Sequence, residues 1–241
     1  MKSSSGPPVP VLMQMASHPL RWALMTELAA SDLRVRELVQ AVGEPQNLVS
    51  YHLGLLRSAE LVTSRRSSFD GRVTYYHLDL GRCAAALGDA AAALHPSLAP
   101  AMTDSSPGSS VLFLCTGNGA RSPMAEALLQ RRQGSQVKVA SAGSHPKPAV
   151  HPNARRVLQA EYGIDLGPRR PQAMDAVSGP FDYVITLCDK IREIPHHQGT
   201  AVTMHWSLPD PSASGSDDDA TYPEFQRVAR EIEARIGYLS L

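Results

Sequence analysis

Cys115 and Arg121 are separated by five residues in the segment Val111–Glu126, in which an apolar run, a glycine-containing loop and a proline-initiated helix follow one another. A cysteine at the carboxyl end of a strand lies at the sheet edge where doubly wound folds place their sites. The free amide groups at the start of the next helix favour an anion, and an arginine guanidinium clamps two oxygens of such an anion. The segment therefore predicts a cup for a tetrahedral oxyanion, with the Cys115 sulfur as nucleophile at its floor.

Gly117 and Gly119 permit backbone conformations in which successive N–H groups converge on an anion. The same positive surroundings favour a thiolate at Cys115. The alternative is a buried structural cysteine with an unrelated surface arginine. That interpretation leaves the strand, the two glycines and the helix start at Ser122-Pro123 unexplained, so we favour the oxyanion cup.

The second half of the chain alternates between strand-like and helix-like runs, which predicts a parallel sheet covered by helices on both faces. One face of the last helix carries Phe225, Val228, Ile232 and Ile236. Strands are expected at 111–114, 137–140, 181–187 and 201–205, and helices at 123–132, 153–162 and 222–239.

The first half predicts helices followed by a hairpin, which is the order of a winged helix-turn-helix. One helix starts at Pro19, a short one runs from Val35 to Gly43, and another starts at Gln46 or Asn47. Strand-like runs at 61–66 and 73–78 are joined by a loop containing Asp70-Gly71, a hairpin signal. An alanine-rich helix is expected at 81–94.

Composition limits the classes of function. The 241 residues carry a formal net charge of zero, so bulk charge does not indicate a nucleic-acid partner. Three cysteines, no signal peptide and no membrane-spanning apolar run predict a cytoplasmic protein with free thiols. We expect a disordered tail at 1–8 and a linker at 97–110 between domains at 9–96 and 111–241.

The run Cys-Thr-Gly-Asn-Gly-Ala-Arg-Ser-Pro-Met-Ala-Glu at 115–126 resembles the active-site loop of the low-molecular-weight tyrosine phosphatases and of the arsenate reductases that share their fold. The resemblance covers 111–241 and implies an α/β doubly wound domain with a four-stranded parallel sheet. It makes Cys115 the nucleophile, Arg121 the oxyanion ligand, Ser122 a hydrogen-bond donor to the thiolate and Asn118 a residue that holds the loop. The oxyanion loop comprises Thr116, Gly117, Asn118, Gly119, Ala120 and Ser122.

The family also has a late aspartate that acts as general acid, and Asp210 in Trp206–Pro211 fits it. The alternative for Asp210 is an ordinary turn residue between two prolines. The phosphatases follow this aspartate with aromatic residues, whereas Ser212-Ala213-Ser214 stands here, and 141–146 also resembles the reductases more. Ser122-Pro123, in contrast, is the phosphatase form.

Arsenate reduction needs a second thiol, and Cys188 follows the expected strand 181–187. In this fold that strand lies beside the Cys115 strand, and the ~4.8 Å between neighbouring strands is within the ~7 Å that a disulfide tolerates between Cα atoms. Cys188 is therefore a candidate resolving thiol, the alternative being a small buried residue. No third cysteine follows in 189–199.

A three-cysteine relay is therefore excluded within this domain. We expect no bound cofactor. Either an external reductant (a low-molecular-weight thiol with a redoxin, or thioredoxin) completes the cycle, or reductase activity is lost.

Residues 9–95 resemble the dimeric winged-helix repressors of the ArsR family. The resemblance implies a homodimer on double-stranded operator DNA, with polar side chains of a recognition helix at base edges and arginines of the wing at phosphates. The alternative is a winged helix used only for dimerisation. The candidate DNA-binding residues are Gln46, Asn47, Ser50, Tyr51, His52, Arg65, Arg66 and Arg72.

Arsenic-sensing members of that family carry Cys-x-Cys where this chain has Arg34 and Arg36. Cys83 is alone in its domain, and the histidines show no metal-ligand spacing, so we predict no metal site. The main interpretation is a DNA-binding regulator fused to an arsenate reductase. A phosphate-monoester phosphatase and a repressor that only senses an oxyanion, arsenate or phosphate, are the alternatives.

Overall fold

The computed structural model describes residues 9–95, 108–177, 179–193, 201–215 and 217–239. The chain divides into two compact units, one of Met1–Arg66 with Val73–Thr103 and one of Ser67–Arg72 with Asp104–Leu241. The predicted tail at 1–8 and most of the predicted linker lie outside the described residues.

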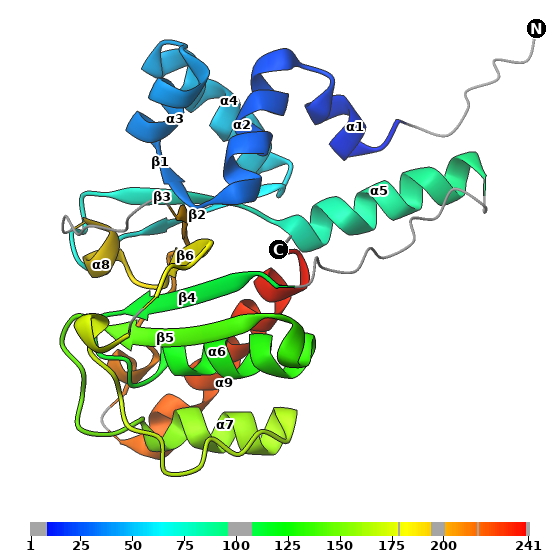
Figure 1. The fold of residues 1–241 in the computed structure, drawn as a ribbon. Helices are drawn as coiled ribbons and strands as arrows, with labels where there is room; N and C mark the ends of the chain where they lie inside the picture. The colour runs from blue at the N-terminus through cyan, green and yellow to red at the C-terminus, as the bar shows by residue number, and fades with distance from the viewer. Residues whose placement is uncertain (1–8, 96–107, 178, 194–200, 216, 240–241) are drawn as a thin grey trace, which may run out of the picture. The chain divides into compact units, whose positions relative to one another are not determined.

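The first unit is mainly helical, with a small antiparallel sheet of strand order β1-β3-β2. Its sheet pairs Arg66 with Thr74 at the end of the predicted hairpin. In chain order the elements are α1 (Val11–Ala16), α2 (Pro19–Ala30), β1 (Leu33–Arg34), α3 (Val35–Val42), α4 (Gln46–Ser58), β2 (Val62–Arg66), β3 (Thr74–Leu78) and α5 (Leu80–Leu94) (Figure 1).

Local chemistry explains the helix boundaries that the sequence predicts. Pro19 occupies the first turn of α2, where its missing N–H leaves no intrahelical bond unmade, and His18 Nδ1 accepts from the Leu20 N–H at 3.2 Å. Gly43 ends α3 in the left-handed conformation, with φ 70°. Helix α1 and the two-residue strand β1 were not predicted from the sequence.

Helix α4 presents one polar face to solvent and buries the other. Gln46, Asn47, Ser50 and Tyr51 are exposed, in agreement with their prediction as surface residues. His52 is only 5 % exposed, and its ring lies 4.4 Å from the ring of a histidine in the turn before α2. The prediction that His52 faces DNA is wrong, because position 52 falls on the side of the helix that packs on the core.

The second unit contains a four-stranded parallel sheet of order β5-β4-β6-β7, which confirms the predicted parallel fold. Its elements are β4 (Ser110–Cys115), α6 (Arg121–Gln133), β5 (Lys138–Gly143), α7 (Pro152–Tyr162), β6 (Tyr183–Thr186), α8 (Asp189–Glu193), β7 (Val202–His205) and α9 (Asp218–Gly237). Short 3₁₀ turns lie at Gly134–Gln136, Met174–Ala176 and Pro211–Ala213.

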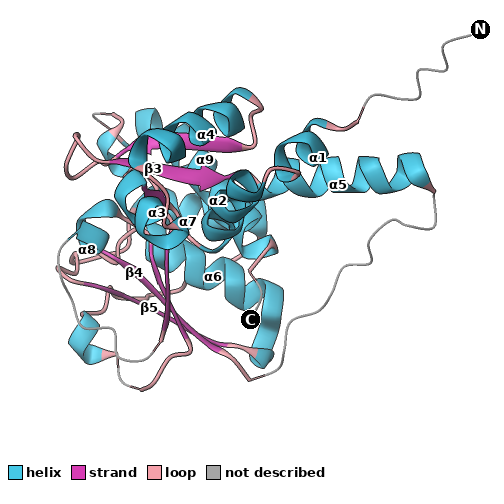
Figure 2. Ribbon diagram, turned by 90° about the horizontal axis from the view of Figure 1, so that it is seen from above, coloured by secondary structure: helices cyan, strands magenta, loops and turns pink. Residues whose placement is uncertain are grey.

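Helices α6, α7 and α9 pack against one another beneath the sheet (Figure 1), and α6 contacts both β4 and β5 (Figure 2). The predicted apolar face of α9 is entirely buried in this core: Phe225, Val228, Ile232 and Ile236. In the part of the chain that the structure describes, no helix has the length and apolar character needed to cross a bilayer.

Several predicted boundaries differ from the structure; β5 runs to Gly143 rather than 140, and α9 begins at Asp218 rather than 222. Helix α6 begins at Arg121 rather than Pro123, because proline is tolerated throughout a first helical turn, where N–H groups lack partners in any case. Ser110 belongs to β4 rather than to the linker, and β6 ends at Thr186 rather than Leu187. Helix α8, directly after Cys188, was not expected.

The strand order places the Cys115 loop, defined here as residues 115–120, at the point where the topology reverses. Strand β5 follows β4 through α6 and pairs with one side of β4. The chain then crosses over, and β6 pairs with the other side of β4. In parallel sheets, ligands bind outside the carboxyl ends of strands at such a switch point. Chain segments leaving β4, β5 and β6 therefore meet at this edge.

Candidate active site

A chain of hydrogen bonds orients the Cys115 thiol. Cys115 is 2 % exposed, and its Sγ lies 3.0 Å from Ser122 Oγ. Asn118 Nδ2 donates to Ser122 Oγ at 2.9 Å and to Ser141 Oγ at 2.8 Å, while its Oδ1 accepts from the Gln172 N–H. Ser122 Oγ accepts from Asn118 and shares a second hydrogen bond with the sulfur, so these two side chains hold Cys115 Sγ in place.

Asn118, and not the glycines, carries the unusual backbone conformation of the loop. Its φ is 43°, whereas neither Gly117 nor Gly119 has a positive φ. Asparagine tolerates this left-handed region. A Cβ at position 117 or 119 would lie 3.2–3.3 Å from side-chain carbons of Lys147, a tight contact that the lysine side chain would have to shift to relieve.

Arg121 is the first residue of α6 and closes the loop. Its side chain is 7 % exposed, with one terminal nitrogen donating to the Leu208 carbonyl at 3.0 Å and the other paired with Asp210 Oδ2 at 3.2 Å. Among the described residues no acceptor reaches its buried Nε. The two terminal nitrogens thus hold the guanidinium in place, and Nε remains a donor without a partner among the described residues.

Asp210 lies at the site, as the sequence predicts. Its Oδ1 accepts from the Ser212 N–H at 3.1 Å and from Ser212 Oγ at 2.7 Å. Burial raises the pKa of Asp210, but the charge of Arg121, the two Ser212 bonds and the charge of Lys147 outweigh it and lower this pKa overall. Asp210 is therefore a carboxylate in this state, and it becomes a general acid only if an oxyanion displaces it from Arg121.

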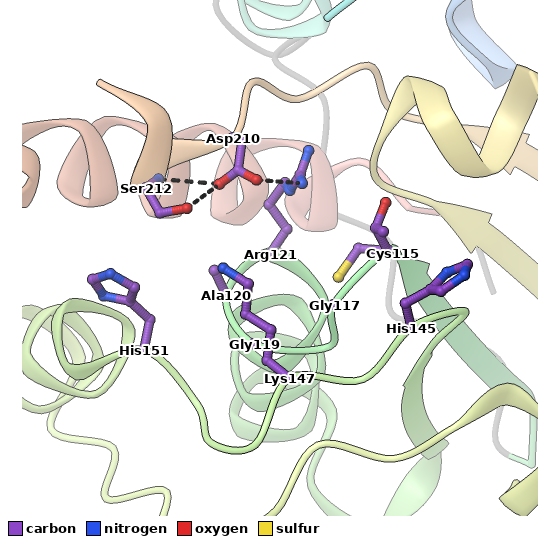
Figure 3. A pocket seen from close by; sticks show the side chains of 11 residues that line it. Cys115, Gly117, Gly119, Ala120, Arg121, His145, Lys147, His151, Asp210 and Ser212 are labelled. Atoms are coloured by element: carbon purple, nitrogen blue, oxygen red, sulfur yellow. Dashed lines mark hydrogen bonds and ion pairs between the residues drawn. The ribbon is translucent and has the colours of Figure 1, made fainter. Parts of the chain in front are cut away.

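The pocket above Cys115 has a volume of ≈ 130 Å³, well below the ~300–1,000 Å³ of pockets for drug-sized ligands. Apart from histidine it has no aromatic lining, so a small anion fits it better than an aryl ester. Figure 3 shows its lining residues: Cys115, Thr116, Gly117, Gly119, Ala120, Arg121, His145, Lys147, His151, Asp210 and Ser212.

A second loop, defined here as residues 144–151, forms one wall of this pocket and was not predicted as part of the site. Backbone N–H groups of this loop donate to carbonyls of the Cys115 loop at 2.8–2.9 Å. The pairs are His145 to Thr116, Lys147 to Gly117 and His151 to Gly119. The sequence offered no periodic signal for this loop, because its proximity depends on the pairing of β5 with β4.

Gly143 makes the close approach of the two loops possible. It pairs with Cys115 at the ends of β5 and β4. A Cβ at position 143 would lie 2.8 Å from both the Asn118 nitrogen and the Thr116 oxygen, closer than real Cβ contacts allow. The glycine is therefore required by the backbone of the Cys115 loop.

The structure brings Cys188 to the Cys115 loop. The thiol is buried, and its Sγ lies 3.3 Å from Thr116 Oγ1. Burial raises the pKa of Cys188, and proximity to Cys115 raises it further, whereas Arg121 and the Thr116 bond partly offset these effects. Cys188 is thus a thiol at neutral pH, next to the proposed nucleophile. All three cysteines of the chain are free.

A buried polar cluster anchors the residue that follows Cys188. Asp189 and His205 are both fully buried, with His205 Nε2 3.3 Å from Asp189 Oδ1. Ser207 Oγ donates to the same oxygen at 2.7 Å, and Thr186 Oγ1 lies 2.8 Å from His205 Nδ1. This cluster ties the start of α8 to the end of β7 and so fixes the position of Cys188.

The three arginines of the predicted hairpin differ in exposure. The Arg72 side chain is 95 % exposed, Arg66 is exposed and Arg65 is half-buried. Arg34, in the first unit, donates to Glu37 at 2.9 Å and helps to start α3. Across the described residues, no cluster of three or more histidine, cysteine or acidic side chains is arranged to hold a metal ion.

Comparison with known proteins places residues 110–240 in a protein family. They match the family model of the low molecular weight phosphotyrosine protein phosphatases. Arsenate reductases of Brevibacillus brevis and Bacillus subtilis are 38 % and 34 % identical over 128 and 131 residues, each match covering 52 % of this chain and 90 % or 91 % of the relative. A solved arsenate reductase from Archaeoglobus fulgidus is 30 % identical, with 53 % of this chain and 95 % of that chain covered and a TM-score of 0.45.

The match to the family covers the whole parallel sheet, the Cys115 loop and the Asp210 segment. The relatives are covered over nearly their full length, so the second unit corresponds to a complete enzyme of this type. The chain belongs to the low molecular weight phosphotyrosine protein phosphatase family.

Proposed function

We propose that the second unit is a thiol-dependent arsenate reductase. The observation that carries this proposal is the position of Cys188, whose sulfur lies beside the Cys115 loop and contacts Thr116. A phosphatase needs one nucleophilic thiol at this site, whereas a reductase needs two. The arsenate reductases among the relatives, and the absence of an aromatic wall after Asp210, support the same conclusion.

In the first step the Cys115 thiolate attacks arsenic, and one arsenate hydroxyl takes up a proton from solvent and leaves as water. Arg121 and the amide groups at the start of α6 hold the remaining oxygens. The unpaired Nε of Arg121 is a donor available to this reaction.

In the second step the Cys188 sulfur, after losing its proton, attacks the Cys115 sulfur. A disulfide forms, the sulfur–arsenic bond breaks, and its electron pair passes to arsenic. Arsenic is reduced from the pentavalent to the trivalent state and leaves as arsenite. The two sulfurs together supply the two electrons.

The cycle requires an external reductant. The only other cysteine, Cys83, is a buried residue of α5 in the first unit, where burial and the charge of Asp79 raise its pKa to about 11. We propose that a dithiol such as thioredoxin, or a low-molecular-weight thiol with a redoxin, reduces the Cys115–Cys188 disulfide.

The test measures arsenite release from arsenate by the purified full chain in the presence of a thiol donor. Cys188→Ser should abolish turnover, while Cys83→Ser, the matched control, should not affect it. Arsenite release that persists in Cys188→Ser would contradict the proposal.

A phosphate-monoester phosphatase is a second candidate, favoured by the position of Asp210 beside Arg121. In that reaction Cys115 forms a phosphoenzyme, and Asp210 protonates the leaving oxygen. Hydrolysis of an aryl phosphate that is lost in Asp210→Asn but unchanged in Cys188→Ser would establish it.

For the first unit we propose a winged helix-turn-helix of the ArsR type. We propose that this domain spans 9–96 and that a linker at 97–110 joins it to the second domain at 111–241. Helices α3 and α4 would form the helix-turn-helix and β2–β3 the wing. The exposed polar side chains of α4 support base contacts, and the exposed Arg66 and Arg72 support phosphate contacts. Double-stranded operator DNA is the expected partner.

A homodimer is supported by apolar side chains that the first unit leaves exposed on α1, α2 and α5. Large exposed apolar side chains are candidates for an association surface. They are Val11, Met13, Trp22, Leu87 and Leu94. Light scattering should report a dimer for the full chain and a monomer for Trp22→Glu combined with Leu87→Glu, while Leu48→Glu on the exposed side of α4 should remain dimeric.

DNA binding is tested with a duplex that spans the chain's own promoter. Binding should weaken with salt, and arsenate should change it if the second unit acts as a sensor. No turnover of arsenate or of an aryl phosphate, combined with oxyanion-dependent DNA affinity, would favour the sensing alternative.

A further inference from the structure

Backbone N–H groups of the 144–151 loop hold the Cys115 loop in place by donating to carbonyl groups of the Cys115 loop. Thr116, Gly117 and Gly119 each direct a carbonyl oxygen to an N–H of this second loop at 2.8–2.9 Å. In a trans peptide the carbonyl oxygen and the N–H of the next residue point in opposite directions. The N–H groups that follow these three carbonyls therefore point away from the 144–151 loop. The second loop thus belongs structurally to the oxyanion cup.

Lys147 extends from this loop across the face of the Cys115 loop. Its Cγ and Cδ lie 3.2 and 3.3 Å from the Cβ positions that Gly117 and Gly119 would have. Its side chain lines the pocket together with Arg121 and Asp210, and Figure 3 shows it running beside the Cys115 loop, although the residue as a whole is exposed. The aliphatic stem covers the loop, and the ammonium reaches the mouth of the cup.

The ammonium has a clear electrostatic effect at this mouth but no fixed partner. The charge of Lys147 helps to lower the pKa of Asp210. Its contribution is smaller than those of burial, the Arg121 charge and the Ser212 bonds. Within the described part of the chain, no carboxylate forms an ion pair with Lys147. The cup therefore has two cations, Arg121 buried at its floor and Lys147 at its exposed rim.

We propose that Lys147 is a specificity-determining residue that selects a free inorganic oxyanion over a phosphate or arsenate ester. This inference rests on the proposed oxyanion chemistry of the site. An inorganic dianion bound to Arg121 presents a charged oxygen to the mouth, where the ammonium pairs with it. In a monoester the outward oxygen carries a carbon substituent, which has no charge and would collide with the Lys147 stem.

The first experiment compares steady-state kinetics of the full chain with arsenate and with an aryl phosphate. In Lys147→Met we expect the KM for arsenate to rise about tenfold, which corresponds to ~1.4 kcal/mol, with kcat changed less than about twofold. The aryl phosphate KM should be unchanged or lower. Lys147→Arg should restore most of the arsenate affinity, because it retains the charge.

The matched control is Lys138→Met, which removes the same charge from an exposed residue at the opposite end of β5. It should leave both KM values unchanged. Equal effects of Lys147→Met and Lys138→Met would overturn the proposal, as would an equal loss for arsenate and ester in Lys147→Met.

A binding experiment separates failure of this inference from failure of the proposed function. Alkylation of Cys115 is followed by mass spectrometry at increasing arsenate, phosphate or phenyl phosphate. Lys147→Met should require about tenfold more arsenate or phosphate for half-protection, with phenyl phosphate unaffected. This shift is expected even if the chain releases no arsenite, and its absence overturns the role of Lys147.

Discussion

The Cys115 loop and the exposed face of α4 use polar residues in opposite ways. In the loop, Asn118 and Ser122 are buried, Asn118 donates to Ser122, and Ser122 bonds to the thiol. On α4, Asn47 and Tyr51 project into solvent. The polar groups of the loop are already ordered by bonds within the protein, which suits a catalytic site, whereas the polar side chains on the helix face are solvated. Substitutions should therefore affect reactivity in the loop and affinity on the helix.

The largest expected effect is that of Cys115→Ser. Loss of the nucleophile should lower arsenite release and any ester hydrolysis by at least ~10³-fold, while DNA affinity and the melting temperature change little. Paired activity and DNA-binding assays on the same preparation measure this. A parallel loss of DNA binding would show that the two regions are not separable.

The second effect concerns pH. Because burial raises the pKa of Cys188, its thiolate is a minor species near neutral pH, and arsenite release at saturating arsenate should rise about tenfold per pH unit until Cys188 titrates. Ester hydrolysis, which does not use Cys188, should lack this rise. A flat profile for arsenite release would mean that the resolving step does not limit the rate.

The third effect belongs to the exposed face. Asn47→Ala should weaken specific DNA binding by ~1–3 kcal/mol without changing stability, and Arg66→Ala should reduce the slope of log affinity against log salt by ~0.9. Fluorescence anisotropy at several salt concentrations distinguishes the two. Lys138→Met is a charge control in the second unit, and the same loss of slope there would contradict a phosphate contact by Arg66.

The fourth effect, of similar size, tests the backbone of the loop. Gly143→Ala should lower the free energy of unfolding by ~1–3 kcal/mol, because its Cβ would collide with the backbone around Asn118. Tyr51→Ala, a larger change on an exposed surface, should alter it by less than ~0.5 kcal/mol. Denaturant melts measure both, and equal effects would remove the distinction between the two regions.

Sequence patterns predicted what local chemistry determines. The strand–loop–helix at Cys115, the start of α4 at Gln46 and the buried face of α9 each follow from spacing, turn residues or apolar periodicity within one segment. The exposure of His52 was predicted incorrectly, since alternation of polar and apolar residues along a helix does not show which polar side chain packs inward.

The other errors arose where distant segments meet. Lys147 and Gly143 belong to the site only because β5 pairs with β4, and the resemblance of 141–146 to the reductases does not reveal that pairing. The positive φ of Asn118 likewise reflects its bonds to Ser141 and Gln172, which come from separate segments. Pairing partners of this kind are set by the completed sheet rather than by local propensity.

The assembly of the site from the ends of β4, β5, β6 and β7 has a consequence for folding. Cys115, Gly143, Cys188 and Asp210 are far apart in the chain and become neighbours only when all four parallel strands have paired, a process slowed by long loop closures. An oxyanion therefore binds the native state and no partly folded one. At a concentration of about 100 times its Kd, it would add ~2.7 kcal/mol to the stability of this unit. Cells exposed to arsenate would thus hold more of the enzyme in its folded form.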